Sequence, residues 1–176
     1  ISVLEYTQEK PWAIVKLALA SHRTAGKHAA EMATQTIMGT PVKILEYSGD
    51  WARVQGPDEY ISYVPSNSLH KITQIEFDQW RKSKRYIVTS YQTRLVEEPN
   101  SDKTVTDLVM GNILQLVADE GAFVKLTTPD GREGYVSKED NAKIRASLPS
   151  NFAKTSATVN FVGSVDSADL DLGSVA

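Results

Sequence analysis

One segment of this chain occurs twice, and the duplication limits the folds that the chain can adopt. Residues 38–64 read MGTPVKILEYSGDWARVQGPDEYISYV, and residues 110–136 read MGNILQLVADEGAFVKLTTPDGREGYV. Aligned without a gap at an offset of about 72 residues, they share the opening Met-Gly, a central Gly, a Pro-Asp pair and the closing Tyr-Val. Turn residues and aromatic residues repeated in one register indicate two copies of one small β domain.

Glycine and proline divide each copy into short strands separated by turns. In the first copy, alternation of side-chain character predicts strands at 31–37, 42–47, 51–55 and 60–64. In the second copy the corresponding strands are expected at 104–109, 113–117, 123–127 and 134–136. With one further strand in front of each set, five short strands joined by tight turns predict a small closed barrel, which has no free edge.

The first strand of each copy is less clearly marked. Residues 13–20 (AIVKLALA) are apolar enough for a buried strand, although their alanine content also allows a helical turn. Residues 22–30 are polar and are expected to form a long loop. The second copy is expected to open with a strand at 86–94.

Side-chain alternation also predicts which residues face the core. Val42 and Ile44, with Glu46 following them, are expected on one face of their strand. Trp51 and its equivalent Phe123 are predicted to be core residues of their copies. Gly131 follows Asp130 in a strong hairpin signal, whereas the first copy has Asp-Glu there, so its turn is expected to differ.

Between the copies the pattern changes to that of a helix. Thr73 and Glu76 are spaced as a capping box, in which each residue hydrogen-bonds the backbone N–H of the other. Phe77 and Trp80 follow near helical spacing, together with Ile75, and predict a helix at about 74–84. The basic residues at its far end suit the negative end of the helix dipole and favour a solvated helix end over an anion site. These are Arg81, Lys82, Lys84 and Arg85.

Composition excludes several classes of function. The 176-residue chain has a net charge of -3, which gives no electrostatic basis for binding nucleic acid. No apolar run reaches the roughly 18 residues of a membrane span. The absence of cysteine excludes disulfides, thiolate metal sites and a cysteine nucleophile in these residues. His22, His28 and His70 are expected to be solvated, so we expect no metal, no cofactor and no enzymatic activity.

Four stretches of the first copy and three of the second carry a family resemblance. They are EMATQ at 31–35, MGTPV at 38–42, GDW at 49–51, YISYV at 60–64, VTDLV at 105–109, GN at 111–112 and PDGREGYV at 129–136. With the FDQW helix at 77–80, this succession resembles the paired bacterial SH3 (SH3b) domains of exported NlpC-type cell-wall cysteine peptidases. The similarity is to members of the dipeptidyl-peptidase VI or γ-D-glutamyl-L-diamino acid endopeptidase type, and it covers roughly residues 15–139.

The resemblance implies a mostly β chain with two SH3-like barrels in tandem, joined by a short α-helix and followed by an irregular extension. The implied divisions are a lead-in at 1–12, a first SH3b domain at 13–72, a linker helix at 73–85, a second SH3b domain at 86–140 and an unassigned extension at 141–176. The family's proline-containing loop is replaced here by SHRTAG at 21–26. Its catalytic domain, with an Asp-Cys-Ser-Gly motif and two histidines, is not found in the chain.

The resemblance also implies a binding role. In such enzymes the first SH3b domain contributes an acidic side chain and a tyrosine that hold the free amine of a cell-wall peptide. By position these are Glu31 and either Tyr60 or Tyr63. A carboxylate pairs with an ammonium group and an aromatic face adds cation–π attraction, so the residue types suit that ligand.

Three functions follow as expectations. The preferred one is a non-catalytic binding or targeting module of an exported envelope protein, in the periplasm or on the cell surface. Its partner would be a peptidoglycan stem peptide or an envelope protein. The alternatives are the substrate-gating part of an NlpC-type cysteine endopeptidase, and a structural subunit of a surface lipoprotein complex. The chain begins at Ile1 and not at Met, so it is expected to be processed or trimmed, and any targeting segment would lie outside the given residues.

Overall fold

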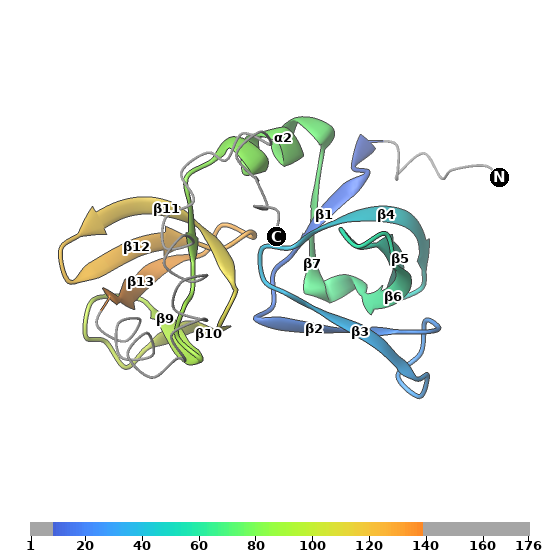
Figure 1. The fold of residues 1–176 in the computed structure, drawn as a ribbon, viewed down its shortest axis with the longest axis horizontal. Coiled ribbons are helices and arrows are strands. Elements are labelled where there is room, and N and C mark those ends of the chain that lie inside the picture. The colour runs from blue at the N-terminus through green and yellow to red at the C-terminus, as the bar shows by residue number, and fades with distance from the viewer. Residues whose placement is uncertain (1–8, 139–176) are drawn as a thin grey trace, which may run out of the picture.

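The computed structural model describes residues 9–138, and within them the chain forms two antiparallel sheets (Figure 1). The first sheet contains β1 Trp12–Val15, β2 Leu19–Arg23, β3 Met32–Ile37, β4 Pro41–Ser48, β5 Trp51–Gln55, β6 Ile61–Pro65 and β7 Leu69–Ile72. A 3-10 turn, η1 Ser66–Ser68, precedes β7, and the helix α2 Gln74–Lys82 runs between the two sheets. The second sheet contains β8 Arg85–Ile87, β9 Gln92–Val96, β10 Thr104–Val109, β11 Ile113–Glu120, β12 Phe123–Thr127 and β13 Glu133–Ser137. The prediction of a mostly β chain is confirmed.

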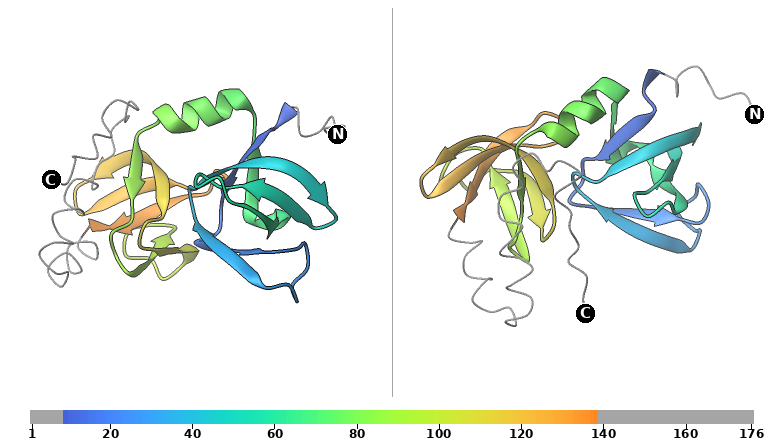
Figure 2. Two further views of the ribbon diagram at one scale, coloured as in Figure 1. Left: turned by 45° about the vertical axis from the view of Figure 1, so that its right-hand side comes forward. Right: turned by 45° about the horizontal axis from the view of Figure 1, so that its top comes forward.

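Six strands of the first sheet follow the same order as the six strands of the second, which makes the duplication structural as well as sequential, and β7 is an additional strand of the first sheet. The orders are β3-β2-β6-β5-β4-β1-β7 and β10-β9-β13-β12-β11-β8. Both sheets curl strongly (Figure 2), but within residues 9–138 neither closes into a barrel. β2 pairs with β6 at one residue position, and β9 pairs with β13 at one, so the regular pairing at these places is short. β3 and β10 therefore remain as sheet edges, and the closed barrels expected from the sequence are not observed.

The first strand of each copy is divided in two. The apolar run at 13–20 forms β1 and the start of β2, because the backbone bends at Leu17 and Ala18 between them. Likewise the segment 86–94 contributes to β8 and to β9. The loop expected from His22 onward begins later, because β2 continues to Arg23.

A β-bulge occurs at the same place in both copies. The register between β4 and β5 shifts between Ile44 and Glu46, and the register between β11 and β12 shifts between Leu116 and Ala118. A bulge places one extra residue in a strand and reverses the alternation beyond it. Tyr47, not Glu46, therefore packs against the core of the first sheet, and the expected placement of Glu46 beside Ile44 is wrong.

The turn before β6 has the same backbone conformation as the turn before β13, although the residues of the two turns differ. Glu59 has φ +64°, and Gly131, at the same place before β13, has φ +86°. Both turns carry the same hydrogen bonds: Glu59 N–H donates to the carbonyl of Gly56, and Gly131 N–H donates to that of Thr128. The turn expected to differ therefore keeps its shape, with a glutamate in a left-handed conformation that favours glycine.

Each sheet encloses its own apolar core, and one residue crosses between them. The first core consists of Ala13, Val15, Ala20, Val42, Ile44, Ala52, Val54, Val64 and Leu69. The second consists of Val88, Leu95, Leu108, Leu114, Val124, Leu126 and Val136, together with Met38 from the first copy. Met38 is fully buried. The core of the second sheet is therefore completed by a side chain of the first copy.

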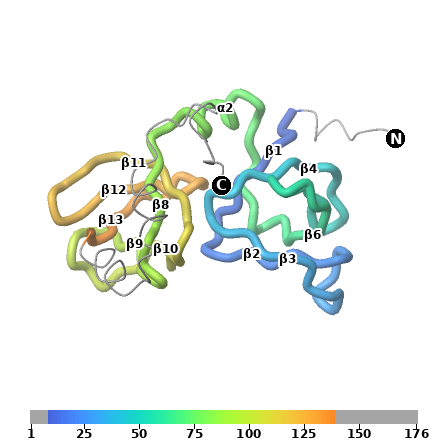
Figure 3. The backbone as a smooth tube through the Cα atoms, in the orientation of Figure 1, coloured from blue at the N-terminus to red at the C-terminus, as the bar shows by residue number. Residues whose placement is uncertain are grey.

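The copies meet through their equivalent Met-Gly turns (Figure 3). Ile113 N–H donates to the carbonyl of Met38 over 3.0 Å, and Asn112 Nδ2 donates to the carbonyl of Ala18 over 2.9 Å. A Cβ on Gly39 would overlap the carbonyl oxygen of Ile113, and one on Gly111 would lie 2.8 Å from the side chain of Ile37. Glycine at both turns permits this close, reciprocal approach.

The helix α2 forms as the capping box predicts. Thr73 N–H donates to Glu76 Oε2 over 2.7 Å, and Glu76 N–H donates to Thr73 Oγ1 over 3.2 Å. Phe77 and Trp80 are buried in a third cluster with Ile14 and Ile72, whereas Ile75 is 71% exposed. Trp12 stacks on Phe77 with ring centroids 4.1 Å apart. The helix is therefore fixed to β1 and β7 of the first sheet.

Candidate functional site

The structure describes all three residues predicted to bind a ligand, and all lie in the first copy. Glu31 is exposed immediately before β3, and its carbonyl accepts the N–H of Thr24 over 3.0 Å. Tyr63 is half-buried in β6, and its hydroxyl donates to Glu46 Oε1 over 3.5 Å. Tyr60 lies just before β6 and is 49% exposed.

The two tyrosines do not lie in one groove. Tyr60 and the buried Ser62 line a polar groove of about 390 Å³ beside β3. Tyr63 points to the opposite face of β6, because side chains alternate along a strand. There it lies close to Gly26 of the loop between β2 and β3. Neither Glu31 nor Tyr63 lines the polar groove, so the structure does not gather the predicted residues into one pocket.

His22 is the buried centre of the polar groove, which corrects the expectation that it is solvated. Its side chain is 1% exposed. Nδ1 lies 2.8 Å from Ser62 Oγ, and Nε2 lies 2.7 Å from Thr36 Oγ1. Burial lowers the pKa of His22, and the negative charge of Asp58 offsets part of this effect. The alternation of Ala20 and His22 in β2 was the sequence signal for its burial.

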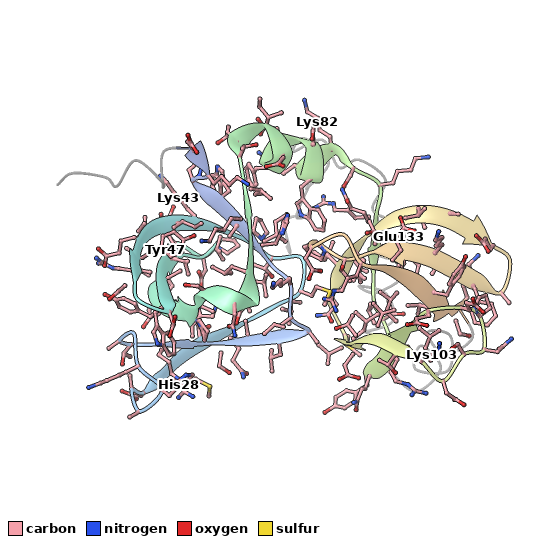
Figure 4. All side chains as sticks on the ribbon, turned by 180° about the vertical axis from the view of Figure 1, so that it is seen from behind. His28, Lys43, Tyr47, Lys82, Lys103 and Glu133 are labelled. Carbon is pink, nitrogen blue, oxygen red and sulfur yellow. The ribbon has the colours of Figure 1, made fainter. Side chains whose placement is uncertain are left out.

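A second groove, the aromatic groove, lies on the other side of the first sheet. It has a volume of about 1270 Å³ and is bounded by β2, the β4–β5 hairpin and η1. Leu17, Leu19, Tyr47 and Trp51 supply apolar surface, and Lys71 Nζ lies 4.2 Å from the centroid of the Tyr47 ring. Figure 4 labels Tyr47 and His28, both of which lie along this groove. No single segment of the sequence predicts the whole groove, because its lining residues come from separate elements.

Trp51 is buried, as predicted, but outside the core cluster. It is 7% exposed, while Ala52 and Val54, which alternate with it, belong to the core. Trp51 is covered instead by the loop between β2 and β3, where the His28 ring lies edge-on at 5.0 Å. Phe123 occupies the same register position in β12 but is half-buried outside the second core, so the prediction that it is a core residue is wrong. The two aromatic residues are equivalent in position, and the loop accounts for the deeper burial of Trp51.

The two grooves are lined by aromatic, hydroxyl-bearing, apolar and charged side chains. The chain contains no cysteine. Within residues 9–138, no three His, Asp or Glu side chains are grouped to hold a metal ion. In the same range no helix has the length and apolar character to cross a membrane. What the grooves offer is aromatic surface, hydroxyl groups and separate charges.

One family model matches a part of the first copy. Residues 22–69 match the family model of the bacterial dipeptidyl-peptidase SH3 domain. No curated protein matches the chain. The match extends from β2 to the start of β7, and includes Glu31, Tyr60 and Tyr63. The second copy lies outside it.

Two solved structures share the fold of both copies. One is an NlpC/P60 family protein from Bacillus cereus ATCC 10987, with a TM-score of 0.62, 16% identity and coverage of 73% of this chain and 55% of that protein. The other is an NlpC/P60 endopeptidase from Photobacterium damselae subsp. piscicida, with a TM-score of 0.51, 16% identity and coverage of 73% of this chain and 31% of that protein. The chain therefore spans about half of the first structure and a third of the second. The resemblance to the SH3b domains of NlpC-type peptidases is confirmed, and residues 22–69 carry the family match.

Proposed function

We propose that this chain is a non-catalytic tandem SH3b module of an exported cell-envelope protein that binds cell-wall peptide or docks a protein partner. In this proposal each curled sheet is an SH3-like unit, the first at 13–72 and the second at 86–140, with the segment 73–85 as linker. The match of residues 22–69 to a dipeptidyl-peptidase SH3 domain carries the proposal. The shared fold with two NlpC/P60 proteins supports it.

The proposed contacts with cell-wall peptide are those of Glu31, Tyr60 and Tyr63. The exposed carboxylate of Glu31 would pair with the free amine of the peptide. Tyr60, half exposed at the polar groove, would offer a ring face to the same cation. Tyr63 would act from the other face of β6, so the two tyrosines are alternatives for one ligand amine.

A second candidate function is the substrate-gating part of an NlpC-type cysteine endopeptidase. It is favoured by the coverage of the Bacillus cereus protein, of which this chain matches 55%. Without cysteine, the residues of this chain would contribute only binding. An Asp-Cys-Ser-Gly motif with downstream histidines in the same reading frame after Ala176 would favour this candidate, and their absence would favour a separate module.

The test is a calorimetric titration with muropeptides that carry a free L-Ala-γ-D-Glu terminus. We expect Glu31→Gln to weaken binding about tenfold, because a charge-assisted hydrogen bond contributes roughly 1.5–3 kcal/mol. The matched control is Glu98→Gln, an exposed glutamate in a loop of the second copy. Equal affinity in the Glu31 variant and the parent would remove Glu31 from the site. No binding by either protein would contradict the cell-wall ligand itself.

A further inference from the structure

We infer that the aromatic groove of the first copy is a separate docking site for an extended acidic peptide segment that carries apolar side chains. The inference concerns a surface other than the proposed amine site, because Glu31, Tyr60 and Tyr63 do not line this groove. Two observations support the inference. The groove exposes apolar side chains and cations, and the second copy carries different residues at the equivalent positions.

The wall of the groove exposes large apolar side chains. Leu17 is 41% exposed and Leu19 is 47% exposed, and both line the groove opposite Tyr47 and Trp51. Isolated apolar residues are common on protein surfaces, but several around one groove indicate an interaction site. An extended peptide places alternate side chains along such a groove, so apolar residues at every second or third position would meet this wall.

The charges around the groove select an acidic occupant. Arg23 and Lys71 supply two cations, and among the described lining residues Asp50 is the acidic one. Arg23 Nη1 donates to the carbonyl of Ala30 over 3.2 Å, which holds the guanidinium at the β2 side of the groove. Lys71 lies on β7, so the two cations come from different strands. An occupant with carboxylates spaced along an extended backbone is complementary to this arrangement, and a basic occupant is not.

The second copy shows that the groove is not an automatic product of the fold. Tyr47 pairs with Ala52 across the hairpin as Asp119 pairs with Val124, and Ser66 N–H bonds the carbonyl of Asp50 as Lys138 N–H bonds that of Ala122. Asp119 and Lys138 therefore occupy the positions of Tyr47 and Ser66. In the second copy these two side chains form an ion pair. The same backbone thus carries a salt bridge at the place where the first copy offers an aromatic ring.

This difference supplies a variant that replaces the aromatic ring in the groove with residues found at the equivalent positions of the second copy. The double substitution Tyr47→Asp with Ser66→Lys places the ion pair of the second copy into the first. The probe is the synthetic peptide Ac-Ser-Leu-Glu-Thr-Leu-Glu-amide, compared with versions in which both glutamates are replaced by Gln or by Lys. Binding is followed by NMR, through shifts of the Trp51 indole N–H during titration. The matched control is Asp119→Asn, which breaks the ion pair of the second copy and leaves the groove intact.

We expect the Glu peptide to shift the Trp51 signal in the parent and in Asp119→Asn. The Lys peptide should bind at least tenfold more weakly, and the double variant should lose at least tenfold in affinity for the Glu peptide. Lys71→Gln leaves Tyr47 and Ser66 in place and should reduce the preference for the Glu peptide over the Lys peptide. This single substitution tests the inference even if the double variant does not fold. Equal binding of all three peptides, or an unchanged affinity in a folded double variant, overturns the inference. A failed muropeptide titration leaves this result unaffected, since the two probes address different residues.

Discussion

The contact between the two Met-Gly turns predicts that Gly39→Ala is far more destabilising than alanine at another left-handed glycine. Gly39 has φ +88°, a conformation that costs an alanine about 1–2 kcal/mol. Its Cβ would also overlap the carbonyl oxygen of Ile113 and lie 2.6 Å from the Cβ of Ile113. Backbone at that place cannot rotate away, so the two copies must move apart.

Separation of the copies has a cost that follows from the contacts described. It weakens the hydrogen bond from Ile113 N–H to the carbonyl of Met38, which contributes about 1 kcal/mol. Separation also exposes part of the Met38 side chain, and the lost burial costs about 1–2 kcal/mol. With the left-handed conformation included, Gly39→Ala should lower the free energy of unfolding by about 3–5 kcal/mol.

The matched control is Gly49→Ala. Gly49 also has a positive φ, of +58°, but a Cβ there meets nothing within 4 Å. Gly49→Ala should lower the free energy of unfolding only by the cost of the left-handed conformation, about 1–2 kcal/mol. Gly111→Ala should fall between the two, because its Cβ meets the flexible end of the Ile37 side chain. Urea unfolding of the full chain, followed by tryptophan fluorescence, measures all three. Equal losses for Gly39→Ala and Gly49→Ala would refute the proposed role of the contact.

Two further predictions concern single residues of the first copy. Burial lowers the pKa of His22, so the unfolded chain binds more protons than the folded one once pH falls below about 6.5. The free energy of unfolding should therefore decrease from pH 8 to pH 5. Urea midpoints should show a smaller decrease in His22→Gln than in the parent, which would attribute the loss to this residue. An identical decrease in both proteins would contradict the role of His22. Glu59→Gly should stabilise the chain by about 0.5 kcal/mol, because relief of the left-handed conformation exceeds the added backbone entropy of glycine. The reverse change, Gly131→Glu, should destabilise it by a similar amount, and a destabilised Glu59→Gly variant would show that the glutamate makes a favourable contact.

The sequence predicts the local elements well where turn residues mark both ends. The strands at 104–109 and 123–127 have the expected bounds, and the helix begins after Thr73 as the capping box requires. Prediction fails where the backbone departs from strict alternation. The bulge after Ile44 reverses the faces of β4, and no residue type at that place signals it.

The contact between the copies could not be read from the duplication. Met38 and Met110 are equivalent in the alignment, but Met38 enters the core of the other copy while Met110 is only half-buried. A repeat predicts two similar units and gives no information on which unit inserts a side chain into the other. The open sheet edges have the same origin, because closure depends on distant strands that a local pattern does not relate.

The candidate site is predicted in part. Glu31, Tyr60 and Tyr63 are described, and their role in binding stays a prediction. His22 was missed because a histidine before a polar run suggests a loop, although its alternation with Ala20 indicates a buried position in a strand. The full lining of the aromatic groove could not be predicted, because Leu17, Tyr47 and Lys71 are brought together only by the fold.

The insertion of Met38 into the second core has a consequence for the inheritance of this pair. A gene fragment that ends after the first copy would bring a fully buried methionine into water, and one that begins with the second copy would leave a hole among its leucines and valines. Neither copy is therefore expected to fold as well alone as in the pair. We expect recombination between genes to transfer the two copies together, with a constant distance between their outer surfaces.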